Sequence, residues 1–507
     1  MRASSASRRS TATRFASLGG LLLLATSLAC DRTITVTSLL DENTASAPDG
    51  NCTLREALVA ANTNVAVDAC IAGQPGADVI ALPAGTYALT LAGGGDDVGD
   101  LDVLEDVSLV GAGAATTSID ASAIGDRVLD VAAGVTASAS DLTIRGGHVT
   151  GAVGELVAGG GIRNAGALTL TRVTVAANEA RAARNSLFSP TGTHAEGGGI
   201  ASSGSLTLVA SEVTDNLALG GAGGVDCLSL SCFVVGAAEG RGGGIFASGP
   251  VEVTDTTVAG NQARGGAGID GNPGGIPGYI FVSAGGNGVG GGVRALGTLA
   301  VARSTFSANA ALGGRGGNGF ATPYNIAGGR AGDGAGGAIA VAAATTVVNA
   351  TITGNTSQGG AGGANGGAAG GSSGGAIVSS DALALTHATL SENAGGAAIA
   401  ASGATTLANS ILAATCSGVA GASLGGNVES PGDTCGFAEA DDIVGASAAA
   451  VGLGALAANG GPTQTQAIAA GSAAAGHGRA ASCEPIDQRG VARPASGCDS
   501  GAFEAAE

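Results

Sequence analysis

A repeated unit of about twenty residues constrains what this chain can fold into more than any other feature. Each copy opens with a motif of small residues, mostly glycine, before an aliphatic residue, and apolar or Thr residues follow six, eight and thirteen positions later. The copies begin at Gly159, Gly197, Gly242, Gly290, Gly336, Gly374 and Gly396. Sixteen positions after the aliphatic residue, the seventh copy has Thr415 and the first six have asparagine: Asn178, Asn216, Asn261, Asn309, Asn355 and Asn393.

Apolar residues within each copy alternate with Thr, Ser, Ala or charged residues, which is the two-residue period of a β-strand. Short strands of this kind bury no face alone, but stacked copies cover one another. Like positions stack on like when the chain coils with parallel strands, and such coils take the right-handed sense. We therefore predict an all-β, right-handed parallel β-helix solenoid of about ten to twelve rungs, each rung being one turn of the coil and adding ~4.8 Å.

The same pattern assigns roles to the corners of the coil. Aliphatic residues form inner columns, and the six asparagines form a ladder at one corner. There, their amides can hydrogen-bond from rung to rung and the residues tolerate left-handed backbone angles. Glycine at the other corner permits positive φ and a close approach of the backbone.

Insertions of variable length separate the copies. Successive glycine motifs lie 38, 45, 48, 46, 38 and 22 residues apart, and the surplus falls between the asparagine and the next glycine motif. The insertions are rich in glycine, as in residues 359–375. We expect loops along one side of the solenoid, either flexible spacers, the favoured interpretation, or a functional face. Glycine has no three-residue period across the chain, which excludes a collagen triple helix.

Charge and composition restrict the partners. The formal net charge is −19, and because the chain has no lysine, its strongly basic side chains are all arginine. An acidic chain with scattered arginines disfavours nucleic acid and anionic lipid surfaces as partners. It suits solubility and is compatible with cation binding.

An export signal is predicted at the N-terminus. Four arginines within residues 2–14 precede an apolar run over 15–29, and this pattern is typical of a signal peptide over residues 1–29. Small residues at Ser27 and Ala29 suit ordinary signal peptidase, whereas Ala29-Cys30 resembles a bacterial lipobox with Ser27 where Leu is usual. We expect an extracellular or cell-surface protein associated with the outer membrane, in preference to a periplasmic one. Its contact with membrane would come only through a lipid on Cys30.

Cysteine spacing agrees with export. The chain has nine cysteines, and without Cys30 the remaining eight fall into close neighbours, although the sequence does not fix their connectivity. Exported chains with such local pairs usually form disulfides. The candidate pairs are Cys52 with Cys70, Cys227 with Cys232, Cys416 with Cys435, and Cys483 with Cys498.

Both flanks of the repeat carry longer motifs. Residues 52–57, followed by Ala60-Ala61-Asn62, resemble the bacterial CSLREA domain, with Thr53 in place of the usual Ser. Thr53 and Glu56 form a capping box that opens a helix through about Ala61. We assign residues 30–75 to a small helical cap over the open end of the solenoid, in which Arg55 and Glu56 are structural.

The segments 78–87 and 107–113 look like the opening coils of pectin-lyase-like β-helices, and we assign the β-helix to residues 76–415. The C-terminal region, 416–507, resembles the choice-of-anchor Q family and is expected to be an irregular cap. The motifs that carry this resemblance are residues 459–465, 487–490, Arg493-Pro494 and 498–504, with a departure at 475–478. The resemblance implies a bacterial surface or secreted protein of undefined activity.

Catalytic patterns are weak. A hydrolase of the pectin type needs paired carboxylates, and Asp441, Asp442 and His477 lie outside the repeated coils. A lyase needs acidic calcium ligands beside a basic group, whereas Arg145, Arg172 and Arg303 are isolated. We therefore assign no catalytic and no cofactor-binding residues.

Metal-binding patterns are incomplete as well. Residues 265–270 match the start of a calcium nonapeptide that Gly271-Asn272 interrupts, and 313–318 form a weaker partial match. The four histidines, His148, His194, His387 and His477, show no ligand spacing. We expect no cofactor and assign no metal ligand, with Ca²⁺ as the weaker alternative.

The sequence thus favours an exported, non-enzymatic β-helix surface protein, adhesin-like or a structural scaffold, with extracellular glycan or cell-surface components as partners. The alternative is a polysaccharide lyase or glycoside hydrolase that acts on an acidic polysaccharide. A clustered acidic patch with an arginine on one strand face would favour the enzyme. A smooth groove lined by Thr, Ser and Asn would favour binding.

Overall fold

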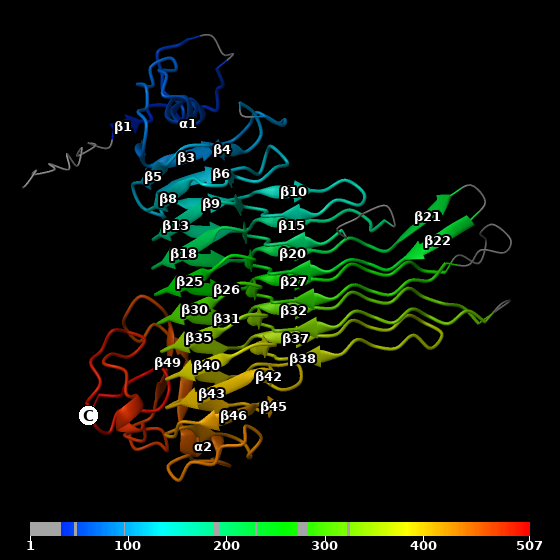
Figure 1. Cartoon of the computed structure of the whole chain (residues 1–507), viewed down its shortest axis with the longest axis vertical. Helices are drawn as coiled ribbons and strands as arrows, with labels where there is room; N and C mark the ends of the chain where they lie inside the picture. The colour runs from blue at the N-terminus through cyan, green and yellow to red at the C-terminus, as the bar shows by residue number, and fades with distance from the viewer. Residues whose placement is uncertain are drawn as a thin grey trace, which may run out of the picture. The chain divides into compact units, whose positions relative to one another are not determined.

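Short parallel strands coil into a β-helix (Figure 1). The computed structural model describes residues 32–506 apart from 45–47, 96, 187–192, 229–230, 272–280 and 322–324, and it gives no side chains for 227–228, 231–232 and 420–422. The predicted signal peptide and Cys30 lie outside the described residues. From Arg32 onward the chain forms one compact unit.

One coil of the repeat consists of β12 (Ile162–Asn164), β13 (Ala167–Thr171) and β14 (Thr174–Ala176). The next coil repeats it as β17 (Ile200–Ser202), β18 (Ser205–Val209) and β19 (Glu212–Thr214). The strands pair in parallel, with Ile162 opposite Ile200, Leu168 opposite Leu206 and Val175 opposite Val213. These partners are the positions that the repeat aligns, so the predicted solenoid and its register are observed.

Three long sheets form the walls of the coil. The twelve-stranded sheet contains β13, β18, β1 (Arg32–Thr35), β2 (Asp78–Leu82), β5 (Val107–Gly111), β8 (Thr136–Ser140), β25 (Val251–Thr254), β30 (Leu299–Ala302), β35 (Thr345–Val348), β40 (Leu383–Thr386), β43 (Ala404–Ala408) and β46 (Ala420–Ser423). The ten-stranded sheet contains β12, β17, β4 (Leu101–Val103), β7 (Leu129–Val131), β24 (Ile245–Ala247), β29 (Val293–Ala295), β34 (Ile339–Val341), β39 (Ile377–Ser379), β42 (Ile399–Ala401) and β45 (Cys416–Ser417). The eleven-stranded sheet contains β14, β19, β3 (Gly85–Ala88), β6 (Thr117–Asp120), β9 (Thr143–Arg145), β26 (Thr257–Ala259), β31 (Thr305–Ser307), β36 (Thr351–Thr353), β41 (Thr389–Ser391), β44 (Ile411–Ala413) and β47 (Val428–Glu429).

Side chains that point into the coil form one continuous apolar core. Ile162, Leu170 and Val175 are fully buried there, and their counterparts in the other coils are buried as well. Most of the outward residues between them are polar or small, with exceptions such as Phe246, because successive residues of a strand face opposite sides. Burial of these stacked aliphatic columns is the main source of stability for the coil.

The asparagine ladder runs along one corner. The side-chain Nδ2 of Asn178 donates to Oδ1 of Asn216 at 2.9 Å, and the same bond repeats from Asn216 to Asn261 and onward to Asn393. The expectation of left-handed angles at these asparagines is wrong. The left-handed residue is the one before each asparagine, as at Ala177 (φ 53°) and Asp215 (φ 55°). The first glycine of each motif has positive φ as predicted, for example 69° at Gly159. The prediction of a separate corner for it is wrong, because the motif packs against the asparagine ladder: a Cβ at Gly161 would lie 2.8 Å from the side-chain amide of Asn178.

A helical cap covers the N-terminal end. Helix α1 (Leu54–Thr63) begins with the predicted capping box between Thr53 and Glu56. Arg55 is buried and pairs with Asp41 at 2.8 Å, while its guanidinium also donates to the carbonyls of Gly99 and Asp100. Both Arg55 and Glu56 therefore hold the cap in place.

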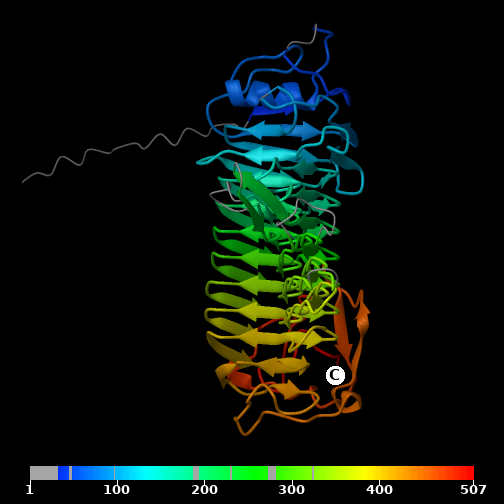
Figure 2. The same cartoon turned by 90° about the vertical axis from the view of Figure 1, so that its right-hand side faces the viewer.

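The C-terminal region closes the other end and folds back along the coil (Figure 2). Parallel pairing continues beyond residue 415 through β45, β46 and β47. The remainder includes α2 (Ala448–Val451), an antiparallel pair of β48 (Leu453–Ala457) and β49 (Thr465–Ile468), and the 3-10 turn Ala480–Ser482. It docks on outward hydroxyls of the eleven-stranded sheet: Gln488 donates to Thr305 at 2.8 Å and accepts from Thr351 at 2.7 Å.

Three disulfides staple both flanks: Cys52–Cys70, Cys416–Cys435 and Cys483–Cys498. Cys227 and Cys232 face each other in register, but their side chains lie outside the described ones. Disulfides are typical of oxidising compartments, which agrees with export. Among the described residues, no helix has the length and apolarity to cross a bilayer.

The glycine-rich insertions form a lateral arm instead of flexible spacers, so that expectation is wrong (Figure 1). The arm begins as two six-stranded parallel sheets beside the coil. The outgoing strands are β10 (His148–Thr150), β15 (Glu179–Arg181), β20 (Leu217–Leu219), β27 (Gln262–Arg264), β32 (Ala310–Leu312) and β37 (Thr356–Gln358). The returning strands are β11 (Val157–Ala158), β16 (Ala195–Glu196), β23 (Gly240–Arg241), β28 (Gly288–Val289), β33 (Gly334–Ala335) and β38 (Ser372–Ser373), and a hairpin of β21 (Gly224–Leu228) and β22 (Ser231–Val235) extends one insertion.

Beyond these strands, the longer insertions continue as an outgoing leg and a return leg that are stacked by backbone hydrogen bonds. The N–H of Gly316 donates to Ala361 on the next outgoing leg at 2.9 Å, and the N–H of Gly317 donates to Ser283 on a return leg at 2.9 Å. The third residue, Asn318, is exposed. This three-residue alternation is that of a polyproline II helix.

Glycine is required where the legs touch. A Cβ at Gly314 would overlap the carbonyl oxygen of Gly266, and one at Gly332 would overlap that of Gly286. A local three-residue glycine pattern therefore exists in the arm, although none runs through the whole chain.

Candidate functional site

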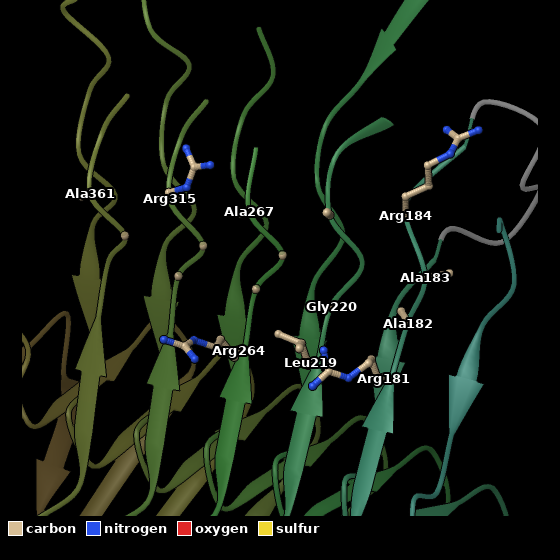
Figure 3. Close-up of a pocket in the computed structure, with 16 residues that line it drawn as sticks. Arg181, Ala182, Ala183, Arg184, Leu219, Gly220, Arg264, Ala267, Arg315 and Ala361 are labelled. Atoms are coloured by element: carbon tan, nitrogen blue, oxygen red, sulfur yellow. The ribbon is translucent and has the colours of Figure 1, made fainter. Parts of the chain in front are cut away.

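A groove of about 580 Å³ runs across the outgoing legs of the arm (Figure 3). Its floor consists of glycine and alanine from successive legs, so no large side chain fills it. Four exposed arginines stand along its sides: Arg181, Arg184, Arg264 and Arg315. The stacked legs place these charges on one face, although 131 residues separate Arg184 from Arg315 (315 − 184).

The arginines belong to two columns set by the register of the arm. In the first column, Arg181 lies opposite Leu219, and Leu219 lies opposite Arg264, which is followed by Leu312. The second column lies three residues further along each leg. Backbone hydrogen bonds between the legs align its members, which are Arg184, Ala222, Ala267 and Arg315. Figure 3 shows the guanidinium of Arg181 beside Leu219.

Acidic partners outside the groove hold three of the four arginines. Glu179 accepts from Arg181 at 2.7 Å, and Asp226 accepts from Arg184 at 2.9 Å. Asp270 accepts from both terminal nitrogens of Arg315, one of them at 3.1 Å. These contacts fix the guanidinium groups, and because a guanidinium has five N–H donors, each keeps donors for a ligand.

The groove is locally basic on an acidic protein. None of its lining residues is Asp or Glu, whereas the whole chain has a formal net charge of −19. Arg264 makes no ion pair with any described residue, so its charge is not neutralised within the protein. Such a site attracts anionic groups and has no carboxylate to act as a general acid or base.

A second cluster lies on the ten-stranded sheet near the N-terminal cap. Carboxylate oxygens of Asp100, Asp102 and Asp130 lie within 4.8 Å of one another. Arg127 contacts Asp100 at 2.9 Å and Asp130 at 3.5 Å, and Arg163 donates to Asp130 at 3.0 Å. Burial, together with neighbouring carboxylates, raises the pKa of Asp100 above its ordinary value although Arg127 opposes the shift.

This acidic cluster is tied to the cap. Asn62 of helix α1 donates to the backbone carbonyl of Asp102 at 2.7 Å, and Arg55 donates to that of Asp100 at 3.2 Å. The two arginines largely offset the carboxylates. The arrangement holds the cap on the first coils, and it is also an acidic patch beside an arginine, the feature that would favour an enzyme.

The candidates considered from the sequence have structural partners. Asp441 pairs with Arg479, which lowers the pKa of that carboxyl, and Asp442 accepts from the backbone of Asn427 at 3.0 Å. The nearby His477 also contributes to the lowered pKa of Asp441. The pairs therefore bind the C-terminal region to itself.

The isolated arginines also form ion pairs on the outer surface of the coil. Arg145 contacts Asp120 at 2.9 Å, Arg172 contacts Asp141 at 2.6 Å and Arg303 contacts Asp255 at 2.8 Å. In the partial calcium motif, the carboxylate of Asp270 is occupied by Arg315 and by the N–H of Asn318 at 2.9 Å.

The histidines have different partners in the fold. His148 contacts Glu179 at 3.3 Å on the edge of the arm, and His194 lies beside Arg241 at 3.2 Å. His387 is fully buried under the C-terminal region, where burial lowers its pKa to about 3.

The sequence reading missed both clusters. The arginines of the groove lie in insertions of unequal length, so their alignment is visible only once the legs stack. The aspartates at 102 and 130 are register partners in strands that precede the clear repeats. A signal was present in the three-residue spacing of Arg181 and Arg184 and in the glycine pattern around Arg315.

Comparison with known proteins returned similar folds only. No protein-family model matches the chain, and no curated protein matches it. Among solved structures, pectate lyase Pel9A is 12% identical, with 94% of this chain and 97% of that chain covered and a TM-score of 0.40. The A-module of the Azotobacter vinelandii mannuronan C-5 epimerase AlgE4 is 14% identical, with 80% and 94% covered and a TM-score of 0.27. Pectin methylesterase from carrot is 10% identical, with 78% and 85% covered and a TM-score of 0.26.

Proposed function

We propose that this is an exported, non-enzymatic surface protein that binds an extracellular glycan on its glycine-rich arm. The observation that carries the proposal is the groove, in which four arginines stand over a floor without large side chains. Guanidinium groups remain protonated at physiological pH and donate hydrogen bonds without accepting protons. The groove therefore suits recognition, and it lacks the carboxylates that hydrolysis of a glycosidic bond requires.

Three features together support display at the cell surface. The three disulfides suit an oxidising compartment, and residues 1–29 have the pattern of a signal peptide. The flanking motifs resemble CSLREA and choice-of-anchor Q proteins. A lipid on Cys30 would attach the protein to the outer membrane.

The test is a glycan array probed with the purified mature protein, run beside assays for new reducing ends and unsaturated uronates. We expect binding to a subset of glycans and no turnover of any of them. Release of reducing ends or unsaturated products would contradict the non-enzymatic assignment, and a blank array would contradict glycan binding.

The acidic cluster supports a second candidate function, cleavage of an acidic polysaccharide. Asp100, Asp102 and Asp130 lie close enough to share a cation, and Arg163 is exposed beside them. If this site is catalytic, turnover should occur with added Ca²⁺ and should be lost in Asp102→Asn. Binding by the arm should be unchanged in that variant.

A further inference from the structure

We infer that the ligand of the arm is a linear polyanionic glycan that lies parallel to the stacking axis of the coils. This inference rests on the proposed function and specifies its ligand. It follows from the direction of the groove, the spacing of its charges and the donors that the arginines leave free.

The direction follows from the floor. Gly220, Gly265, Gly313 and Gly360 come from consecutive outgoing legs and line the same groove. Because each leg lies one rung beyond the last, the floor extends along the stacking axis. The two columns of side chains border it on either side, so an elongated ligand fits along the axis and not across it.

The charges are spaced for a polymer. Arg181 and Arg264 are two rungs apart, roughly 9.6 Å at ~4.8 Å per rung. Arg184 and Arg315 are three rungs apart, roughly 14.4 Å on the same basis. A compact anion such as phosphate cannot reach across such intervals, whereas a chain with an acidic group on successive or alternate sugars can.

Apolar residues occupy the positions between the charges. Leu219 separates Arg181 from Arg264 in the first column, and Ala222 and Ala267 separate Arg184 from Arg315 in the second. The C–H faces of pyranose rings pack against such side chains while the acidic groups reach the guanidiniums. No aromatic residue lines the groove, so stacking of nucleobases has no platform there.

Two arginines of the groove are held in place by the protein itself. Glu179 holds Arg181 through Nε and one terminal nitrogen, and Asp270 holds Arg315 through both terminal nitrogens. Nη1 of Arg181 and Nε of Arg315 are left for a ligand. Preorganised donors reduce the entropy lost on binding.

The experiment measures affinity by calorimetry with three length series: oligogalacturonates, sulfated heparin-derived oligosaccharides and neutral cello-oligosaccharides. The two acidic series separate carboxylate from sulfate recognition. We expect binding of at least one acidic series, with affinity that rises with length until the chain spans Arg181 to Arg315 and then levels off. Raising salt from 50 to 300 mM should weaken binding at least fivefold, because salt screens exposed charges.

Variants of the full mature protein locate the site. Arg264→Gln should weaken binding about fivefold, and the triple variant Arg181→Gln, Arg264→Gln, Arg315→Gln at least thirtyfold. The matched controls Arg145→Gln and Arg330→Gln remove exposed charges outside the groove, on the coil and on a return leg. They should leave affinity within twofold.

Distinct outcomes separate this inference from the function on which it rests. Neutral oligosaccharides that bind as well as acidic ones, with no loss in the triple variant, would overturn the polyanion inference and leave glycan binding intact. Equal losses in the control variants would overturn the groove as the site. Tighter binding of single-stranded DNA of matched length would overturn the glycan, and no binding of any series would overturn both proposals.

Discussion

The coil and the arm are two parallel stacks with opposite physical origins. In the coil, aliphatic side chains such as Ile339 pile on their equivalents and are fully buried. In the arm, the legs touch through backbone, and a Cβ at Gly314 or Gly317 would overlap the neighbouring leg. One stack is held by buried side chains and the other by hydrogen bonds between polypeptide backbones that carry almost no side chains. A stack of parallel segments can therefore arise from repeated apolar side chains or, equally, from positions without a side chain.

The largest effect should come from a cavity in the coil. Ile339→Ala removes a fully buried side chain between Val293 and Ile377. We expect the free energy of unfolding to fall by about 2–5 kcal/mol in urea denaturation. The exposed neighbour variant Thr346→Ala, on the outer face, should change it by less than ~0.5 kcal/mol. Equal effects would show that the aliphatic columns are not the core.

A methyl group in the arm should have a smaller and local effect. Gly314→Ala places a Cβ against the backbone of Gly266, which cannot rotate away. We expect about 3 kcal/mol of local destabilisation, seen as protease cleavage within the arm while global unfolding in urea changes little. Ala361→Ser, at an exposed arm position, is the matched control. Unchanged protease resistance in Gly314→Ala would contradict close contact between the legs.

The two stacks also differ in their response to acid, because the backbone contacts of the arm do not titrate. Burial lowers the pKa of His387 to about 3 in the folded protein, against 6.5 when unfolded. Between these values the unfolded state binds the extra proton, so stability falls as pH falls from about 6.5 toward 3. At pH 5 the loss is about 2 kcal/mol, from 1.5 pKa units at about 1.36 kcal/mol each.

Urea unfolding of the protein and of His387→Asn at pH 7 and pH 5 tests this acid dependence. The variant should lose most of the difference between the two pH values, while His148→Asn, at a partly exposed position, should keep it. An unchanged difference in His387→Asn would show that other groups control the acid response.

The smallest effect should come from ion pairs on the coil surface. Arg303 pairs with Asp255 at 2.8 Å at a partly exposed corner. Arg303→Gln should lower the free energy of unfolding by less than ~1 kcal/mol, measured at low salt, and the loss should shrink at high salt. A loss comparable to that of Ile339→Ala would mean that the corners contribute as much as the core.

The coil could be predicted from the sequence because each inward position repeats at a fixed interval, as Ile162, Leu168 and Val175 do. The arm could not be predicted in the same way. Its legs differ in length and have no apolar pattern. What specifies their stacking is the set of positions occupied by glycine, where the legs touch. The left-handed backbone angle is at the residue before each ladder asparagine. That position varies from copy to copy, so the repeated asparagine did not point to it.

The candidate site was less predictable than the fold. Arg181 and Arg264 share a column only because two insertions of different length stack in register. Asp270 looked like part of a calcium motif in the sequence, whereas in the fold Arg315 of the neighbouring leg binds that carboxylate. A site whose residues come from different insertions cannot be recognised from the spacing of motifs along the chain.

Hydrogen exchange of the arm amides tests the central claim most directly. The N–H groups of Gly266, Gly286, Gly314 and Gly332 each donate to a carbonyl on an adjacent leg at 2.8–2.9 Å. If the legs are stacked as described, peptides that contain these glycines should exchange slowly, approaching the protection of the β31 and β36 strands. Complete exchange within the earliest time points, at the rate of an unstructured glycine-rich chain, would contradict the account.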